Sequence, residues 1–172
     1  MAESDSRDSK TAGAESRDKV SIIVFSGDMD KAFAAFNIAT GAAASGMEVT
    51  MFFTFWGINM LKKTTGRRGA SSFLGKMFDL LLPKGPAKLP ISKMNMGGVG
   101  AALMRRQMAA KKVQPLSGFM ELARELGVKI VACSMSMDVM EVPKEDLVGV
   151  DEFAGVAAFL KEAAESKITL FV

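Results

Sequence analysis

The sequence contains no histidine and no tyrosine, and it has only one cysteine and one tryptophan among its 172 residues. Without histidine, the chain cannot form a Ser-His-Asp triad, a Cys-His pair or an imidazole metal site. With one cysteine, it cannot form an internal disulfide or a four-thiolate zinc or iron–sulfur site. Any chemistry must therefore use the cysteine, carboxylates, lysines, hydroxyls or a borrowed cofactor. The sequence shows no motif for a cofactor or a metal, and we predict neither.

The amino-terminal segment is also poor in apolar residues. Residues 1–18 are mostly serine, alanine, glycine and charged residues, and no apolar run follows a basic start. This pattern is not that of a secretory signal, and it predicts a disordered tail. A lone cysteine favours a reducing compartment, so we predict that the protein is cytoplasmic.

One long stretch, residues 32–61, carries a single charge, Glu48. It is long enough to span a bilayer. However, Gly41, Ser45 and Gly46 interrupt it, and a run rich in β-branched and aromatic residues follows. The pattern favours a buried helix followed by a buried strand over a membrane span.

The small net charge of +3 conceals an uneven distribution. Twelve of the 22 basic residues, but only one of the 19 acidic residues, lie between Gly57 and Lys112. This segment therefore has a net charge of +11, against −8 for the rest of the chain. We interpret residues 57–115 as a basic helical insertion. Its charges are either solvated helix surfaces or a docking surface for an acidic protein, a membrane or an anionic substrate. Nucleic acid is not predicted as a partner, because few aromatic residues are interleaved with the charges.

Short apolar runs alternate with helical patterns over residues 19–172. Such alternation predicts right-handed crossovers and a mostly parallel sheet. We therefore expect an α/β fold, a three-layer sandwich with four or five strands and the basic insertion. The expected strands are 20–25, 48–55, 128–132, 148–150 and 167–172, and the expected helices are 31–45, 73–82, 99–111, 116–126, 134–141 and 151–166. The last helix is expected to begin at an Asp151 cap, with Phe153, Val156, Ala157 and Leu160 on its apolar side.

Three of the expected strands end in distinctive residues. The first is followed by Gly27 and Asp28, the second by Trp56 and Gly57, and the third runs into Cys133. Ligands of open parallel sheets bind beyond the carboxyl ends of the strands. We therefore expect these residues to meet at one edge of the sheet and form the candidate substrate-binding site.

Cys133 is the main candidate for catalysis. It lies where a strand ends and a helix begins, and there unpaired backbone N–H groups and the helix dipole stabilise a thiolate. The amides of Ser134, Met135 and Ser136 would hold a thiolate or persulfide anion. The alternative is a buried, inert cysteine.

The segment Val128 to Val142, VKIVACSMSMDVMEV, resembles the cysteine segment of the DsrE/DsrF-like sulfur-relay family, in the branch with a long insertion after the second strand. The strand endings at Ser26-Gly27-Asp28 and Thr54-Phe55-Trp56-Gly57 agree with this resemblance, which covers about residues 19–172. The patch Met94-Asn95-Met96-Gly97-Gly98 and the carboxyl-terminal helix and strand also agree.

The resemblance implies a sulfurtransferase or sulfur carrier in which Cys133 accepts sulfane sulfur as a persulfide and relays it to a partner thiol. It implies rhodanese-like or TusA-like carrier proteins as partners, and assembly into oligomers. We predict a homo-oligomer. No second cysteine is present, so a resolving thiol within the chain is excluded. Two other functions remain open: a non-catalytic scaffold with an inert cysteine, and a peripheral membrane protein that binds through the basic, methionine-rich segment.

Overall fold

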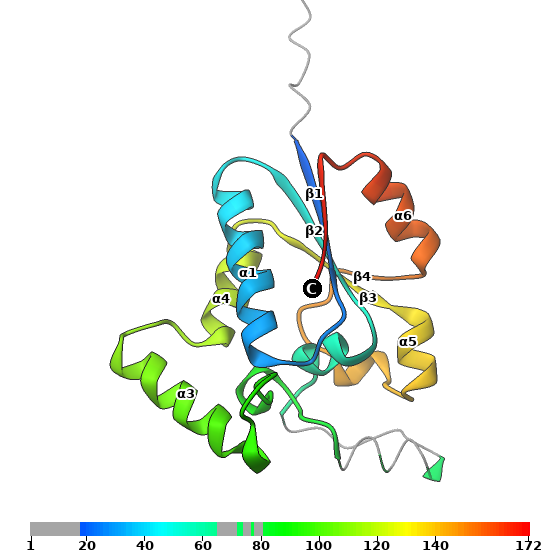
Figure 1. The fold of residues 1–172 in the computed structure, drawn as a ribbon. Helices are drawn as coiled ribbons and strands as arrows, with labels where there is room; N and C mark the ends of the chain where they lie inside the picture. Colours follow the sequence, from blue (N-terminus) through cyan, green and yellow to red (C-terminus); the bar gives the residue numbers. More distant parts are fainter. Residues whose placement is uncertain (1–17, 65–71, 74–76, 78–80) are drawn as a thin grey trace, which may run out of the picture.

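The protein, described by a computed structural model, alternates strands and helices along the chain (Figure 1). The structure describes residues 18–64, 72–73, 77 and 81–172. The strands are β1 (Lys19–Val24), β2 (Glu48–Phe53), β3 (Lys129–Cys133), β4 (Glu152–Ala154) and β5 (Ile168–Phe171). The α-helices are α1 (Met29–Ala44), α3 (Val99–Ala110), α4 (Leu116–Glu125), α5 (Ser134–Val139) and α6 (Val156–Ala164). The short 3₁₀ helices are η1 (Phe55–Leu61), η2 (Pro86–Lys88), η3 (Met96–Gly98) and η4 (Lys144–Asp146).

The five strands form one sheet in the order β4-β3-β2-β1-β5, and every neighbouring pair is parallel. Helices α1 and α4 lie on one face of the sheet, and α5 and α6 lie on the other side (Figure 1). The predicted α/β sandwich with a parallel sheet is therefore confirmed. Parallel strands covered on both faces explain why the β1 sequence is a nearly continuous apolar run.

The two faces of the sheet bury separate clusters. Alternate side chains of each strand point to opposite faces. Ile130 and Ala132 of β3 belong to the large core beneath α1 and α4. Val131 and Cys133 point the other way, into a smaller cluster beneath α6. The strand register thus decides which core each residue enters.

The carboxyl-terminal region differs from the prediction. The strand expected at 148–150 is instead β4, Glu152–Ala154, and helix α6 begins at Val156 after Gly155. The Asp151 carboxylate accepts a hydrogen bond of 2.7 Å from the backbone N–H of Ile130, so it holds β4 beside β3 and does not cap the helix. Phe153, which was expected on the helix, therefore lies in β4.

As a result, the expected apolar side of the last helix is wrong. Phe159 is the buried residue of α6, whereas Val156 and Leu160 are mostly exposed. The physical reason is that sheet pairing uses residues 152–154, which leaves Phe159 as the residue that faces the strands.

The basic segment has two parts with different roles. Its beginning, η1, buries Ile58, Met60 and Leu61 in the main core, and Leu89 is also fully buried. By contrast, α3 projects from the body of the fold (Figure 1) and buries only Ala101. The helix expected at 73–82 lies largely outside the described residues, as does the predicted tail apart from Asp18.

The apolar stretch 32–61 folds as α1, β2 and η1. In the described part of the chain, no helix combines the length and the apolar character needed to cross a membrane.

Candidate functional site

The endings of β1 and β2 pack tightly against each other at the carboxyl edge of the sheet. The Gly57 N–H donates a hydrogen bond of 2.9 Å to the Phe25 carbonyl. A Cβ atom at Gly57 would lie 2.1 Å from the Val24 carbonyl oxygen, so only glycine fits there. A Cβ atom at Gly27 would lie 3.1 Å from the Trp56 carbonyl oxygen. The structure therefore brings Gly27, Trp56 and Gly57 together.

The ending of β2 also contacts helix α5. The hydroxyl groups of Thr54 and Ser136 share a hydrogen bond of 2.8 Å, and Ser136 is completely buried. This bond joins residues that are 82 positions apart in the sequence. It fixes the helix that follows Cys133 to the loop that follows β2, so the second and third strand endings meet at one side-chain contact.

Cys133 is the last residue of β3, and α5 begins at Ser134. The predicted junction of strand and helix is therefore present. Cys133 occupies the N-cap position of α5 with extended backbone angles, φ −72° and ψ 112°. The backbone N–H groups of Ser134, Met135 and Ser136 lie in the first helical turn, where helices leave their amides unpaired.

The Cys133 side chain is enclosed by apolar residues. Only 2% of the residue is exposed, and it clusters with Phe52, Val131 and Phe159. The rings of Phe52 and Phe159 are 4.9 Å apart between centroids, and Phe159 itself is 4% exposed. The thiol is therefore buried on the side of the sheet that carries α6, in the same cluster as Phe159 of that helix.

The two residues after Cys133 differ in exposure. Ser134 is half-buried, whereas 53% of Met135 is exposed. Val139 on the same short helix is exposed as well. The helix therefore presents an apolar outer surface next to a covered cysteine, and this surface is accessible to another protein.

Asp28 is held within its own loop. Its carboxylate accepts a hydrogen bond of 2.9 Å from the Ser26 hydroxyl and lies 3.3 Å from the Lys31 ammonium. The Asp28 backbone N–H in turn donates to the Ser26 hydroxyl. These contacts place the negative charge of Asp28 at the start of α1. The assignment of Asp28 to substrate binding stays a prediction.

A row of aromatic rings extends from the strand endings to the edge of the sheet. Phe25 lies between Phe55 and Phe171, with a centroid separation of 5.6 Å to each. Phe171 belongs to the edge strand β5, and 68% of it is exposed. Trp56 is also partly exposed. Neither this row nor the role of Phe159 was predicted from sequence, because both depend on which strands are neighbours.

Ion pairs lie at the opposite, amino end of the strands. Lys129 at the start of β3 lies 2.8 Å from the Glu152 carboxylate, and this hydrogen bond raises the pKa of Lys129. The hydrogen bond between Lys19 and Glu165, at 2.6 Å, raises the pKa of Lys19 and lowers that of Glu165. Within the described ranges, no group of three or more cysteine and carboxylate side chains is arranged to hold a metal ion.

Residues 16–171 match the model of the DsrE/DsrF/DrsH-like family. The chain belongs to this family. It is 43% identical over 158 residues to the uncharacterized protein YrkE of Bacillus subtilis, a match that covers 92% of this chain and 99% of YrkE. It is 36% identical over 158 residues to the sulfur carrier protein DsrE2 of Allochromatium vinosum, covering 90% of this chain and 98% of DsrE2.

The fold also resembles a solved structure. The crystal structure of the ychN protein from E. coli superimposes with a TM-score of 0.56 over 90% of this chain and 99% of that chain. The sequence identity is 8%, so this similarity concerns the fold alone. The predicted DsrE/DsrF-like family is therefore confirmed. The assignment to a long-insertion branch and the match of the cysteine segment stay predictions.

Proposed function

We propose that this member of the DsrE/DsrF/DrsH-like family carries sulfane sulfur on Cys133. The observation that supports this most directly is that Cys133 is the only thiol of the chain. If this chain relays sulfur through a thiol of its own, Cys133 is therefore the residue that carries it. The 36% identity to a protein named as a sulfur carrier supports the same role.

The proposed reaction consists of two transfers. The Cys133 thiolate attacks the outer sulfur of a donor persulfide, the donor S–S bond breaks, and the donor leaves as a thiolate. A thiolate of the acceptor then attacks the outer sulfur on Cys133, which is released as a thiolate. Each step exchanges one S–S bond for another, so no external oxidant or reductant is needed. The first-turn amides of Ser134, Met135 and Ser136 would hold the perthiolate.

Both transfers require the buried sulfur to become accessible. We infer that α6 moves away from Cys133, because Phe159 of this helix belongs to the cysteine cluster and Ala163 packs against it. A covered persulfide would be protected from small thiols until a partner docks. The cover thus favours transfer between proteins over loss of sulfur to solution.

The test is intact mass spectrometry after incubation with inorganic polysulfide or a persulfidated donor protein. We expect an adduct of one sulfur, about 32 Da, on the wild-type chain. Cys133→Ser should abolish the adduct, and the neighbouring Ser134→Ala should keep it, since it leaves the thiol and the backbone amides in place. An adduct that persists in Cys133→Ser, or one that never forms on the wild type, refutes the proposal.

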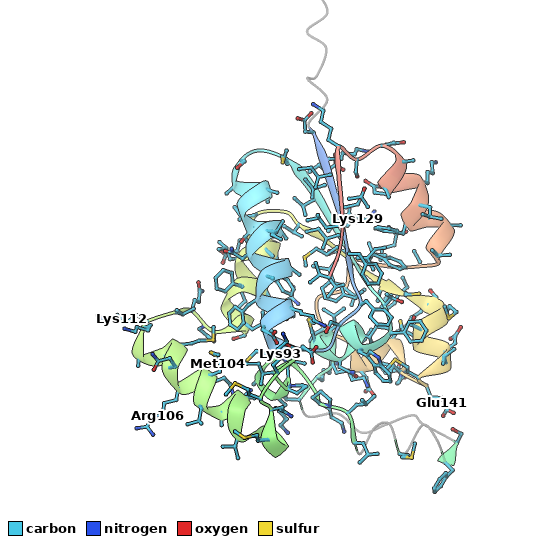
Figure 2. All side chains as sticks on the ribbon, viewed as in Figure 1. Lys93, Met104, Arg106, Lys112, Lys129 and Glu141 are labelled. Carbon is cyan, nitrogen blue, oxygen red and sulfur yellow. The ribbon has the colours of Figure 1, made fainter. Side chains whose placement is uncertain are left out.

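For partners, we propose rhodanese-like or TusA-like sulfur carriers, whose approach is steered by the positive charge of α3 while the sulfur is transferred on the α6 side of the sheet. This helix and its flanks, residues 93–113, contain five basic residues and no acidic residue. Arg106 and Lys112 project into solvent (Figure 2), next to exposed Leu103 and Met104. Such a surface steers an acidic partner. Charge reversal at Arg106 should slow sulfur transfer to an acidic carrier at low salt, whereas Lys161→Glu on α6 should have a smaller effect.

We also propose that copies of the chain associate through the exposed edge of β5. Among the described residues, no strand pairs with the outer side of this edge strand, and Phe171 and Ile168 expose apolar surface along it. Unprotected, apolar edges favour pairing with another chain. Light scattering coupled to size-exclusion chromatography measures the assembly directly.

The exposed apolar and basic residues of α3 also favour a second candidate function, a scaffold at the membrane surface with an inert cysteine. This alternative predicts sedimentation with vesicles that contain anionic lipids, weakened by salt and by Leu103→Glu. It also predicts that Cys133→Ala keeps the biological function. The sulfur-carrier proposal predicts the opposite result for Cys133→Ala.

A further inference from the structure

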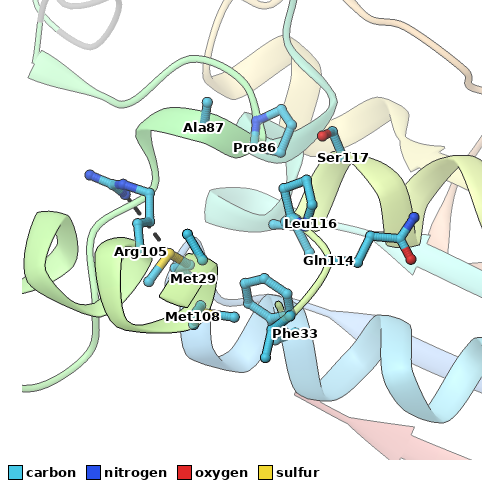
Figure 3. Close-up of a pocket in the computed structure, with 12 residues that line it drawn as sticks. Met29, Phe33, Pro86, Ala87, Arg105, Met108, Gln114, Leu116 and Ser117 are labelled. Carbon is cyan, nitrogen blue, oxygen red and sulfur yellow. Dashed lines mark hydrogen bonds between the residues drawn. The ribbon is translucent and has the colours of Figure 1, made fainter. Parts of the chain in front are cut away.

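A cavity of about 310 Å³ lies between α3 and the body of the fold. Figure 3 shows its lining, which comes from four separate parts of the chain: α1, η2, α3 and the start of α4. Most of the wall is apolar and includes Met29, Phe33, Met108 and Leu116. The cavity is therefore built where α3 packs against the first turns of α1 and α4.

Of the described residues that line the wall, one is charged: Arg105 of α3, which lies beside Met29 (Figure 3). Its Nη1 donates a hydrogen bond of 3.2 Å to the Leu89 carbonyl and lies 3.8 Å from the Met29 sulfur. Among the described residues, no carboxylate pairs with this half-buried guanidinium. The nearby Asp30 carboxylate instead accepts hydrogen bonds from the Ser92 N–H and hydroxyl.

This arrangement leaves part of a cation available to a ligand. A guanidinium has five N–H donors, and both contacts above use Nη1. The Nε and Nη2 donors form a fork that matches the two oxygens of a carboxylate. A partly buried charge without a counter-ion is costly, and an anionic ligand removes that cost.

We propose that this cavity binds a small amphipathic carboxylate, with its apolar body against Met29, Phe33, Met108 and Leu116 and its carboxylate on Arg105. The volume is in the range of pockets for small molecules. It corresponds to about ten water volumes of ~30 Å³ each, which fits a ligand of roughly ten non-hydrogen atoms. The cavity lies on the α1 and α4 side of the sheet, whereas Cys133 points to the α6 side, so this proposal does not depend on the sulfur chemistry.

The test uses octanoate as the probe and 1-octanol as its uncharged counterpart, with binding to the full chain measured by isothermal titration calorimetry. We expect saturable octanoate binding with a dissociation constant of about 1 mM or tighter. Octanol should bind about tenfold more weakly or worse, because it cannot use the guanidinium fork.

Three variants separate the cavity from general surface effects. Arg105→Met should weaken octanoate binding about tenfold or more. Arg106→Met removes the same charge from the next residue of α3, which is exposed and lines a different hollow, and it should leave binding unchanged. Ala109→Leu fills the cavity from an exposed position of α3 and should abolish binding even if Arg105→Met fails to fold.

The proposal is overturned if octanoate shows no saturable binding to the wild type up to several times the expected dissociation constant. It is also overturned if octanol binds as tightly as octanoate, or if Arg105→Met and Arg106→Met weaken binding equally. Octanoate binding that survives in Ala109→Leu would place the ligand elsewhere and likewise overturn it.

Discussion

Access to Cys133 should be controlled by a local movement of α6, and Phe159→Ala tests this directly. Phe159 is nearly fully buried against Phe52 in the cluster that contains the cysteine. Removing a buried phenylalanine side chain costs about 3–5 kcal/mol. Since α6 is a surface helix that relaxes more easily than a central strand, we take the lower value, about 3 kcal/mol. If the thiol reacts only when α6 opens, that loss increases the open population and the reaction rate about 100-fold.

The assay is the rate of Cys133 alkylation by iodoacetamide under native conditions, combined with the urea dependence of that rate. A local opening exposes little surface, so its rate should depend only weakly on urea, unlike global unfolding. The wild type should react slowly.

The matched control is Phe36→Ala. Phe36 is fully buried on the other face of the sheet, where its ring lies 6.0 Å from that of Phe53. This change removes the same side chain from the main core and lowers global stability without touching α6. If cysteine access is local, Phe36→Ala leaves the alkylation rate near the wild-type value. Equal acceleration by both substitutions, in proportion to their losses of global stability, would refute the role of α6 as the cover.

Three further predictions concern other contacts. Ser136→Ala should lower the free energy of unfolding by about 1–2 kcal/mol in urea titrations, because the Thr54 hydroxyl loses its partner. Thr54→Val should then cost less in that background than alone, and additive losses would contradict the coupling. Burial raises the pKa of Asp30, but hydrogen bonds from Ser92 outweigh it and lower the pKa below the ordinary value of 3.8. The ionised carboxylate therefore stabilises the fold above pH 3.8. The free energy of unfolding of the wild type should exceed that of Asp30→Asn by a constant amount above about pH 5, and this difference should disappear as the pH falls through the lowered pKa. A difference that persists in acid would contradict this. Phe171→Lys should reduce the assembled mass in light scattering, and an unchanged mass would exclude the β5 edge as the interface.

The sequence predicted the fold because its signals were local and mutually consistent. Gly46 and Gly127 each have a positive φ, at +85° and +78°, and each follows a helix that was predicted to end there. The β1 and β2 runs are apolar on both faces, as expected for central parallel strands. The junction at Cys133 was predicted for the same reason, since a strand pattern changes to a helical one at that residue.

The region around Asp151 could not be predicted in this way. A short edge strand of three residues has almost no periodicity of its own, and Asp151 before an apolar segment resembles a helix cap. Its actual role is to accept a hydrogen bond from Ile130, a residue 21 positions earlier. Pairing with β3 decided the outcome, and local propensity could not reveal that pairing.

By itself, the sequence determined the type of sheet, the place of the only thiol at a strand end and the concentration of positive charge between β2 and α4. These properties depend on residue identity and on short-range periodicity, which can be read along the chain. Only the tertiary structure decided that Cys133 is buried in one cluster with Phe159 of α6. It also decided that Arg105 lines an apolar cavity without a carboxylate partner among the described residues. Burial and pairing depend on which distant residues become neighbours, and that depends on strand order and register.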